Sequence, residues 1–130
     1  MKKVWRLLSL VVLPGWLLWI GAGSLVHAAD LAQERIEALA KALAAAPSDD
    51  ERHHLLDSAP PELARDEQLR RQFHVLTKAL IYNGEYDRAR GLLSFARQWC
   101  EQSADREGVV LAEMGEGNIH AYQGHNREAL

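Results

Sequence analysis

The chain has a single cysteine, Cys100, among its 130 residues. One cysteine cannot form an internal disulfide, so the fold must be held together by packing alone. Cys100 follows Trp99 near the end of an expected helix, which favours a buried thiol that acts as a small apolar side chain. Pairing with a cysteine of another molecule is the alternative. No cysteine follows the uncharged run near the amino terminus, so a lipid-attachment site is not expected there.

Basic residues do not cluster anywhere beyond the amino terminus. Lys2, Lys3 and Arg6 precede every acidic residue, and without these three, 12 basic residues remain against 18 acidic ones. A nucleic-acid-binding surface needs a clustered basic stripe. The acidic balance therefore argues against nucleic acid as a partner, and it suits a protein that binds other proteins.

The sequence also lacks the motifs that carry catalysis or hold a cofactor. It has no glycine-rich phosphate loop and no Ser/His/Asp arrangement. His53 and His54 are adjacent and would point about 100° apart on a helix, while His120 and His125 flank an expected turn at Gly124, so a zinc site is not expected. The carboxylates gather at expected helix starts, where the helix dipole accounts for them. We therefore predict no enzyme activity, no cofactor and no metal.

The longest run without charge lies at the amino terminus, from Leu7 to Val26. It follows a basic start, and Val26-His27-Ala28 has the small-x-small pattern that signal peptidase accepts. We predict a signal peptide over residues 1–28, and the alternative is an uncleaved anchor, since about 20 apolar residues can span a bilayer. Either topology exports the remaining chain. The sequence thus predicts a periplasmic or extracellular protein, anchored in the inner membrane in the second case, with membrane contact only through this segment.

Helix signals begin directly after this segment. Asp30 is an expected N-cap for a helix that Pro47 closes. Ser48 is a second expected N-cap, opening a short helix to about Ser58. We interpret residues 29–60 as a degenerate first helical repeat. The buried face of its first helix is predicted from an apolar stripe, Ile36, Leu39 and Leu43.

The next segment predicts three longer helices. The first begins at Pro61 or at Asp66 and ends at Gly84, where glycine adopts the left-handed capping conformation at no cost. The other two cover residues 85–102 and about 106–123. The first of the three has apolar residues at spacings of four, three and four, which predict the face turned to the core: Leu69, Phe73, Leu76 and Leu80.

A short-loop hairpin around Gly84 organises this half of the chain. In its second helix Ala89, Leu93 and Ala96 share one face, and the small alanines let another helix approach closely. Gly115 and Gly117 predict a second close approach, because each costs about 1 kcal/mol in a helix relative to alanine.

The residues around this hairpin's turn recur along the chain. Tyr82, Gly84 and Ala89 return 40 residues later as Tyr122, Gly124 and Ala129, which is a helical-repeat period. A further helix is therefore expected to start after Gly124, and the chain is expected to be the front of a longer protein.

These residues resemble the tetratricopeptide repeat, in a long-repeat form typical of exported bacterial proteins. The resemblance covers residues 69–130. It implies an all-α fold in which antiparallel helix hairpins form a short right-handed α-solenoid, with residues 61–130 as TPR-like repeats, the last one truncated. The matching positions are Phe73, Leu76, Thr77 and Leu80 in the first helix of the hairpin, then Gly84, Tyr86, Ala89, Leu93 and Ala96 in the second.

The resemblance also implies a function. In such arrays the first helix of each hairpin lines a concave groove, so a protein or peptide partner is expected there, such as an extended peptide or an acidic tail. The chain would be a non-catalytic interaction or sensory module. The alternative is the periplasmic sensor region of a larger signalling protein: a diguanylate cyclase, a histidine kinase or a transcription regulator. The groove candidates are Arg71, His74, Lys78, Ile81, Leu111, Met114, Asn118 and Tyr122.

Overall fold

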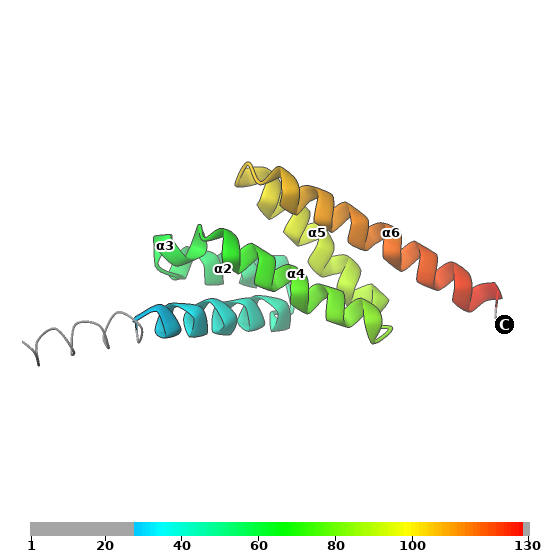
Figure 1. Ribbon diagram of the computed structural model, residues 1–130, viewed down its shortest axis with the longest axis horizontal. Coiled ribbons are helices and arrows are strands. Elements are labelled where there is room, and N and C mark those ends of the chain that lie inside the picture. Colours follow the sequence, from blue (N-terminus) through cyan, green and yellow to red (C-terminus); the bar gives the residue numbers. More distant parts are fainter. Residues whose placement is uncertain (1–27, 129–130) are drawn as a thin grey trace, which may run out of the picture. The chain divides into compact units, whose positions relative to one another are not determined.

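The computed structural model describes residues 28–128, with the side chains described up to residue 124 (Figure 1). The chain divides into two compact units, residues 1–34 and residues 35–130. The described part of the first unit, residues 28–34, is helical. Residues 1–27, which carry nearly all of the predicted signal peptide or anchor, lie outside the described residues. Among the described helices, none is both long enough and apolar enough to cross a membrane.

The described residues are all-α, as predicted, and successive helices pack as antiparallel neighbours. Because the chain reverses before and after α5, α4 and α6 run in the same direction, and each of these three helices contacts the other two (Figure 1). The elements after the first helix, which ends at residue 45, are α2 (Asp49–Ser58), α3 (Pro61–Ala64), α4 (Glu67–Tyr82), α5 (Tyr86–Gln102) and α6 (Arg106–Glu128).

Most helix boundaries follow the predicted capping residues. The Ser48 hydroxyl accepts a hydrogen bond from the Glu51 backbone N–H at 3.2 Å, which satisfies one of the free donors at the start of α2. Both predicted starts after α2 are used, because Pro61 opens the short α3 and Asp66 caps α4. Local side-chain chemistry thus sets these boundaries.

The predicted N-cap at Asp30 is wrong. Asp30 is itself helical, and the described residues before it, Ala28 and Ala29, are helical as well. Alanine has the highest helix propensity of all residues, so this pair continues the helix toward the amino terminus instead of ending it.

The two glycines of the 40-residue pattern behave differently, which overturns one prediction. Gly84 has φ +81°, and the Glu85 N–H donates to the Leu80 carbonyl at 3.0 Å, so the helix stops there. Gly124 lies inside α6, which continues to Glu128. The predicted turn and new helix after Gly124 are therefore wrong, because a single glycine costs only about 1 kcal/mol in a long helix.

The core of residues 35–124 centres on three aromatic rings. Phe73, Phe95 and Trp99 lie with ring centroids 5.8–5.9 Å apart. The predicted stripe of the first helix packs on them through Ile36 and Leu43. A second cluster lies closer to the Gly84 turn and joins α4, α5 and α6; its buried members are Ile81, Ala89, Leu93 and Ile119. The predicted buried face of α5 is thus confirmed.

Arg52 is a buried charge that the sequence did not reveal. Its guanidinium lies 5.4 Å from the centroid of the Phe95 ring and donates to the Ala46 carbonyl at 2.7 Å. The free carbonyls at the end of the first helix carry partial negative charge, so a cation stabilises that end. Arg52 thereby ties α2 to both the first helix and the aromatic core.

We predict that Ala104→Gly stabilises the fold. Ala104 follows α5 with φ +54°, the left-handed region that disfavours any residue with a Cβ. It occupies the position that Gly84 fills after α4, and the Asp105 N–H donates to the Cys100 carbonyl at 2.8 Å in the same way. Relief of the strain should raise the free energy of unfolding by about 0.5–1 kcal/mol, after the entropy that glycine adds to the unfolded chain. Urea denaturation measures this gain, and a loss would contradict it.

Candidate functional site

The candidate site is the surface formed by α4 and α6 side by side. At one end of it the rings of Tyr82 and Tyr122 meet edge to face, with centroids 6.4 Å apart. The Lys78 ammonium lies 5.8 Å from the centroid of the Tyr82 ring, within the range of a cation–π contact. The two parallel helices therefore share a surface on which aromatic rings and a cation lie together.

The structure distributes the eight predicted groove residues over three environments. Ile81 is only 4% exposed and packs against Ala89, Leu93 and Ile119, so it belongs to the core and cannot face a partner. Its position one turn beyond the buried Thr77 turns it toward α5 and α6. Arg71, His74 and Leu111 are half-buried, and Lys78, Met114, Asn118 and Tyr122 are exposed.

Two apolar side chains on α4 replace Ile81 on this surface. Val75 is 56% exposed and Tyr82 is 65% exposed. With Lys78 they lie three and seven residues apart, which is one face of a helix. The sequence contained this signal, since Lys78 belongs to the predicted row and Val75 and Tyr82 each follow a member of it, His74 and Ile81, by one residue. We name the exposed set Val75, Lys78, Tyr82, Met114, Asn118 and Tyr122 the α4–α6 face.

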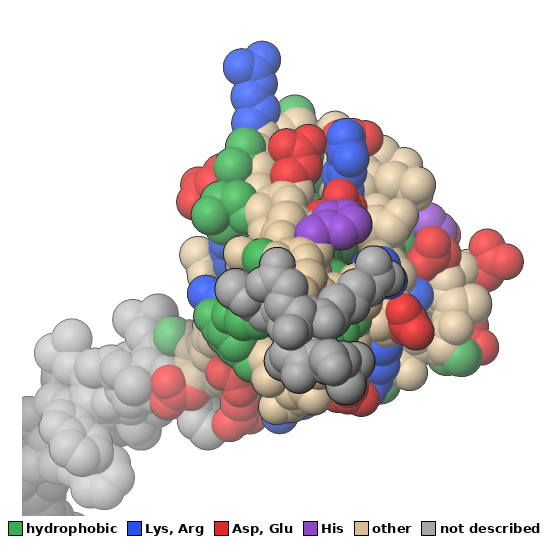
Figure 2. All heavy atoms as spheres, turned by 90° about the vertical axis from the view of Figure 1, so that its right-hand side faces the viewer, with side chains coloured by type: hydrophobic (Ala, Val, Ile, Leu, Met, Phe, Trp, Pro, Cys, Tyr) green, Lys and Arg blue, Asp and Glu red, His purple; other side chains and the backbone are tan. Residues whose placement is uncertain are grey.

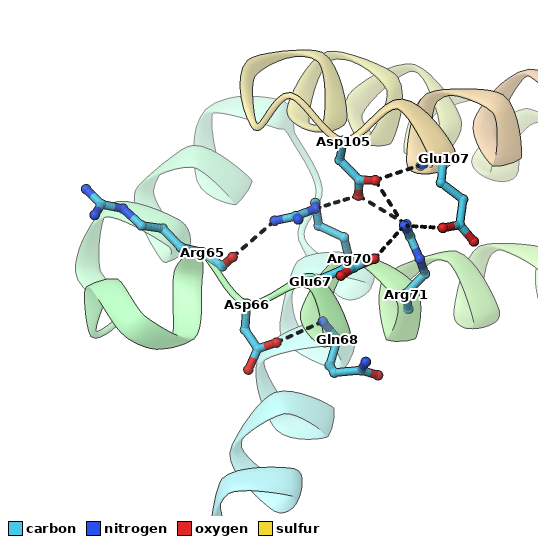
Figure 3. A network of polar contacts seen from close by, with 9 residues as sticks. Arg65, Asp66, Glu67, Gln68, Arg70, Arg71, Asp105 and Glu107 are labelled. Carbon is cyan, nitrogen blue, oxygen red and sulfur yellow. Dashed lines mark hydrogen bonds and ion pairs between the residues drawn. The ribbon is translucent and has the colours of Figure 1, made fainter.

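At the other end of α4 a cluster of charges joins the two helices (Figure 3). Asp105, just before α6, accepts from Arg70 Nε at 2.8 Å and from Arg71 Nη2 at 2.9 Å. Asp105 also accepts from the Gly108 backbone N–H at 3.1 Å and so caps α6. The side chain of Asp105 is 8% exposed and that of Arg70 is 9% exposed. We name Arg70, Arg71 and Asp105 the charge cluster; its largely buried side chains link α4 to the start of α6.

The charge cluster sets the protonation of its members. Hydrogen bonding from Arg71, and to a lesser degree from Arg70 and the Gly108 N–H, holds the pKa of Asp105 well below its usual range against the opposing effect of burial. The bond to Asp105 in turn raises the pKa of Arg71. Burial lowers the pKa of His74, and Lys78 and Arg71 lower it further. At neutral pH the cluster is therefore ionised and His74 is uncharged.

Arg71 is consequently engaged in structure. Besides Asp105 it pairs with Glu67 at 3.0 Å and with Glu107 at 3.6 Å. A guanidinium held by three carboxylates has little capacity left for a ligand. The basic part of the α4–α6 face is Lys78, which has no ion pair among the described residues.

Close approach of the helices is confirmed at one of the two predicted glycines. A Cβ on Gly115 would lie 2.8 Å from Leu93 Cδ2, so α5 and α6 meet there without room for a side chain. Gly117 faces open space, and its predicted role is wrong. The second tight position is Gly108, where a Cβ would lie 2.4 Å from the sulfur of Cys100. Cys100 is buried as predicted, and burial raises the pKa of its thiol to about 11.

Other hollows and charge groups contribute little chemistry. A hollow of about 330 Å³ lies between the end of the first helix and the start of α5, next to Arg52 and Arg88. In the part of the chain that the structure describes, no group of three or more His, Cys, Asp or Glu side chains is placed to hold a metal ion. In the end-on view of Figure 2, hydrophobic, acidic and basic side chains are intermixed, and the basic ones form no continuous patch on the visible described surface.

Comparison with known proteins adds no relative to this picture. No protein-family model matches the chain, and neither a curated protein nor a solved structure matches it.

Proposed function

We propose that the chain is a non-catalytic, TPR-like module that acts outside the cytoplasmic membrane and binds a protein partner along the α4–α6 face. The bound segment would be an extended peptide with apolar side chains and an acidic residue. Export depends on residues 1–28 acting as a signal peptide or anchor. The proposal rests on helix packing, on exposed apolar groups and on charge.

The packing of α4, α5 and α6 supports a TPR-like arrangement. In that family one hairpin is followed by the first helix of the next, and α4, α5 and α6 have this order and these mutual contacts. The crossings use small residues, Ala89 in α5 and Gly115 in α6. Thr77 is larger than the residue usual at its position, but it is fully buried and its hydroxyl donates to the Phe73 carbonyl at 2.9 Å.

The observation that carries the binding role is the exposed apolar group on the α4–α6 face. Val75, Tyr82, Met114 and Tyr122 are four of the six large hydrophobic side chains that are exposed among the described residues. Grouped exposed apolar residues mark interaction sites in soluble proteins, whereas scattered ones do not. Tyrosine is favoured at interfaces because it buries a large ring at a low entropy cost.

Charge defines the partner further. Lys78 lies on the same helix face as Val75 and Tyr82 and is not ion-paired within the described chain. An acidic side chain of the partner would form an ion pair with Lys78, in a partly desolvated site beside an aromatic ring. The remaining face offers apolar contact and the Asn118 amide, which can bond to a peptide backbone.

We predict that Tyr122→Ala with Lys78→Glu weakens partner binding about 30-fold or more. The loss combines removal of a tyrosine that the partner would cover with reversal of a charge at the same surface. The experiment first identifies the partner by crosslinking in a periplasmic extract and then measures affinity for it by calorimetry. Circular dichroism checks that the variant stays folded. Arg71 is not changed, because its reversal would break the charge cluster.

A matched charge reversal on another surface is the control. Lys41 is exposed on the first helix and belongs to neither α4 nor α6, and Lys41→Glu changes net charge by the same amount as Lys78→Glu. We expect the Lys41 variant to bind normally. Equal affinity of the Lys78 and Lys41 variants would show that the partner does not use this face.

A further inference from the structure

The turn between α4 and α5 contains a chemically reactive dipeptide, Asn83-Gly84. In such a pair the backbone nitrogen of the glycine can attack the side-chain amide of the asparagine, and the absent Cβ of glycine leaves the approach open. The other asparagines, Asn118 and Asn126, precede isoleucine and arginine, whose side chains obstruct this attack. Asn83 and Gly84 are both exposed, so water and base reach the turn.

The closed turn holds the reacting atoms apart. Asn83 has ψ −2°, which places the Gly84 nitrogen beside Asn83's own backbone nitrogen and away from its side chain. The Gly84 N–H also donates to the Ile81 carbonyl at 3.1 Å. Ring closure therefore requires rotation about ψ of Asn83 and loss of this hydrogen bond, and neither can happen while the end of α4 is intact.

We infer that Asn83 is a site of spontaneous deamidation that the folded α4–α5 turn protects, so that its modification records opening of the hairpin. In the open turn the Gly84 nitrogen bonds to Cγ of Asn83 and loses its proton, and the Cγ–Nδ2 bond breaks with release of ammonia. Water then opens the resulting succinimide at either carbonyl. The products are aspartate and isoaspartate at position 83, and no oxidant or reductant takes part.

The modification weakens the turn, and its isoaspartate product would prevent the original turn from closing again. Either product adds a negative charge at the carboxyl end of α4, where the helix dipole disfavours it. Isoaspartate also inserts a methylene group into the main chain ahead of Gly84. The bonds from Gly84 to Ile81 and from Glu85 to Leu80 depend on the original chain length. A chain with isoaspartate at position 83 should therefore lose the hairpin geometry that positions Tyr82 beside Tyr122.

The test compares deamidation of the full chain when folded and when denatured. Both samples are kept in the same mildly alkaline buffer, the second with guanidinium chloride, and are then digested with trypsin. The peptide from Ala79 to Arg88 contains Asn83 and is analysed by mass spectrometry, with isoaspartate identified by its fragmentation. We expect the folded chain to react at least about tenfold more slowly, which corresponds to an opening free energy of about 1.4 kcal/mol or more.

A destabilised variant and internal controls complete the test. Leu93→Ala weakens the cluster behind the turn without changing Asn83-Gly84, so the folded variant should deamidate faster than the folded wild type, while both react equally in guanidinium chloride. If this variant does not fold, Ala104→Gly provides the opposite test, with slower deamidation expected. Equal rates in the folded and denatured wild type, or a denatured chain in which Asn118 reacts as fast as Asn83, would overturn the inference.

Discussion

Replacing Asp105 by alanine is expected to lower the free energy of unfolding by about 3–5 kcal/mol. The substitution leaves Arg70 and Arg71 without their shared carboxylate, in a place where the side chain of Arg70 is 9% exposed and that of Arg71 is 20% exposed. A buried guanidinium without a counter-charge costs far more than an exposed ion pair contributes. The same change removes the cap on the Gly108 N–H at the start of α6. Guanidinium denaturation monitored by circular dichroism measures the loss.

Two further variants separate charge from capping and from general surface effects. Asp105→Asn keeps an oxygen that can accept from Gly108 but removes the charge, so most of the loss should remain. Asp87→Ala removes the carboxylate of an exposed ion pair with Arg90 and should change stability little. If the Asp105 and Asp87 variants unfold at the same denaturant concentration, the charge cluster does not make the proposed contribution to the free energy of unfolding.

The same carboxylate predicts how stability depends on pH. Its pKa is lower in the folded chain than in the unfolded one, where aspartate titrates near 3.9. The contribution of Asp105 is therefore complete above about pH 5 and is lost as the pH falls below 4, because the unfolded chain then binds the proton first. Acid unfolding of the wild type should show this loss, and Asp105→Asn should flatten the profile in the same range.

Ala89→Trp is expected to destabilise the fold by about 3 kcal/mol or more, and a hairpin that fails to form is the extreme outcome. Ala89 is fully buried between α4, α5 and α6, in a cluster with Ile81, Leu93 and Ile119. A tryptophan ring cannot enter without forcing these helices apart. Thermal melting by circular dichroism measures the effect, and alkylation of Cys100 gives a second readout, since its buried thiol reacts only when the core opens.

The matched control for this variant is Ala79→Trp. Ala79 is exposed on α4, so the same substitution there adds the same ring without crowding the core. Its melting temperature should stay near that of the wild type. Unchanged melting of Ala89→Trp would count against the packing of the three helices around Ala89.

Local side-chain chemistry explains which parts of the fold were predictable. Ser48 and Asp66 cap their helices through bonds within three residues, and Gly84 ends α4 through its own backbone conformation. Such signals are complete in a short stretch of sequence. Gly115 was also predictable, because a glycine inside a helix needs a packing reason.

The failures share a different physical cause. Asp105 and Arg70 are 35 residues apart, and no local pattern indicates that two helices will place them together. Arg52 was overlooked because, besides the nearby Asp49 carboxylate, its partners are backbone carbonyls, which every residue has. Ile81 was assigned to the groove although the exposed residue is its neighbour Tyr82, which follows it by one position. Gly124 shows that a repeated residue does not imply a repeated turn, since the turn at Gly84 also requires the chain to reverse there.

The sequence separation between helices that pack together bears on how fast the protein folds. The hydrogen bonds that link α6 to α4 and α5 span about 33–35 residues, and the bond from Arg88 to the Ala44 carbonyl spans 44. Chains whose contacts are close in sequence lose little entropy in closing loops, and small helical proteins of this kind fold within microseconds to milliseconds. Each hairpin can therefore assemble as soon as its own helices are present. A stopped-flow or temperature-jump relaxation on this timescale is the kinetic signature expected of residues 35–128.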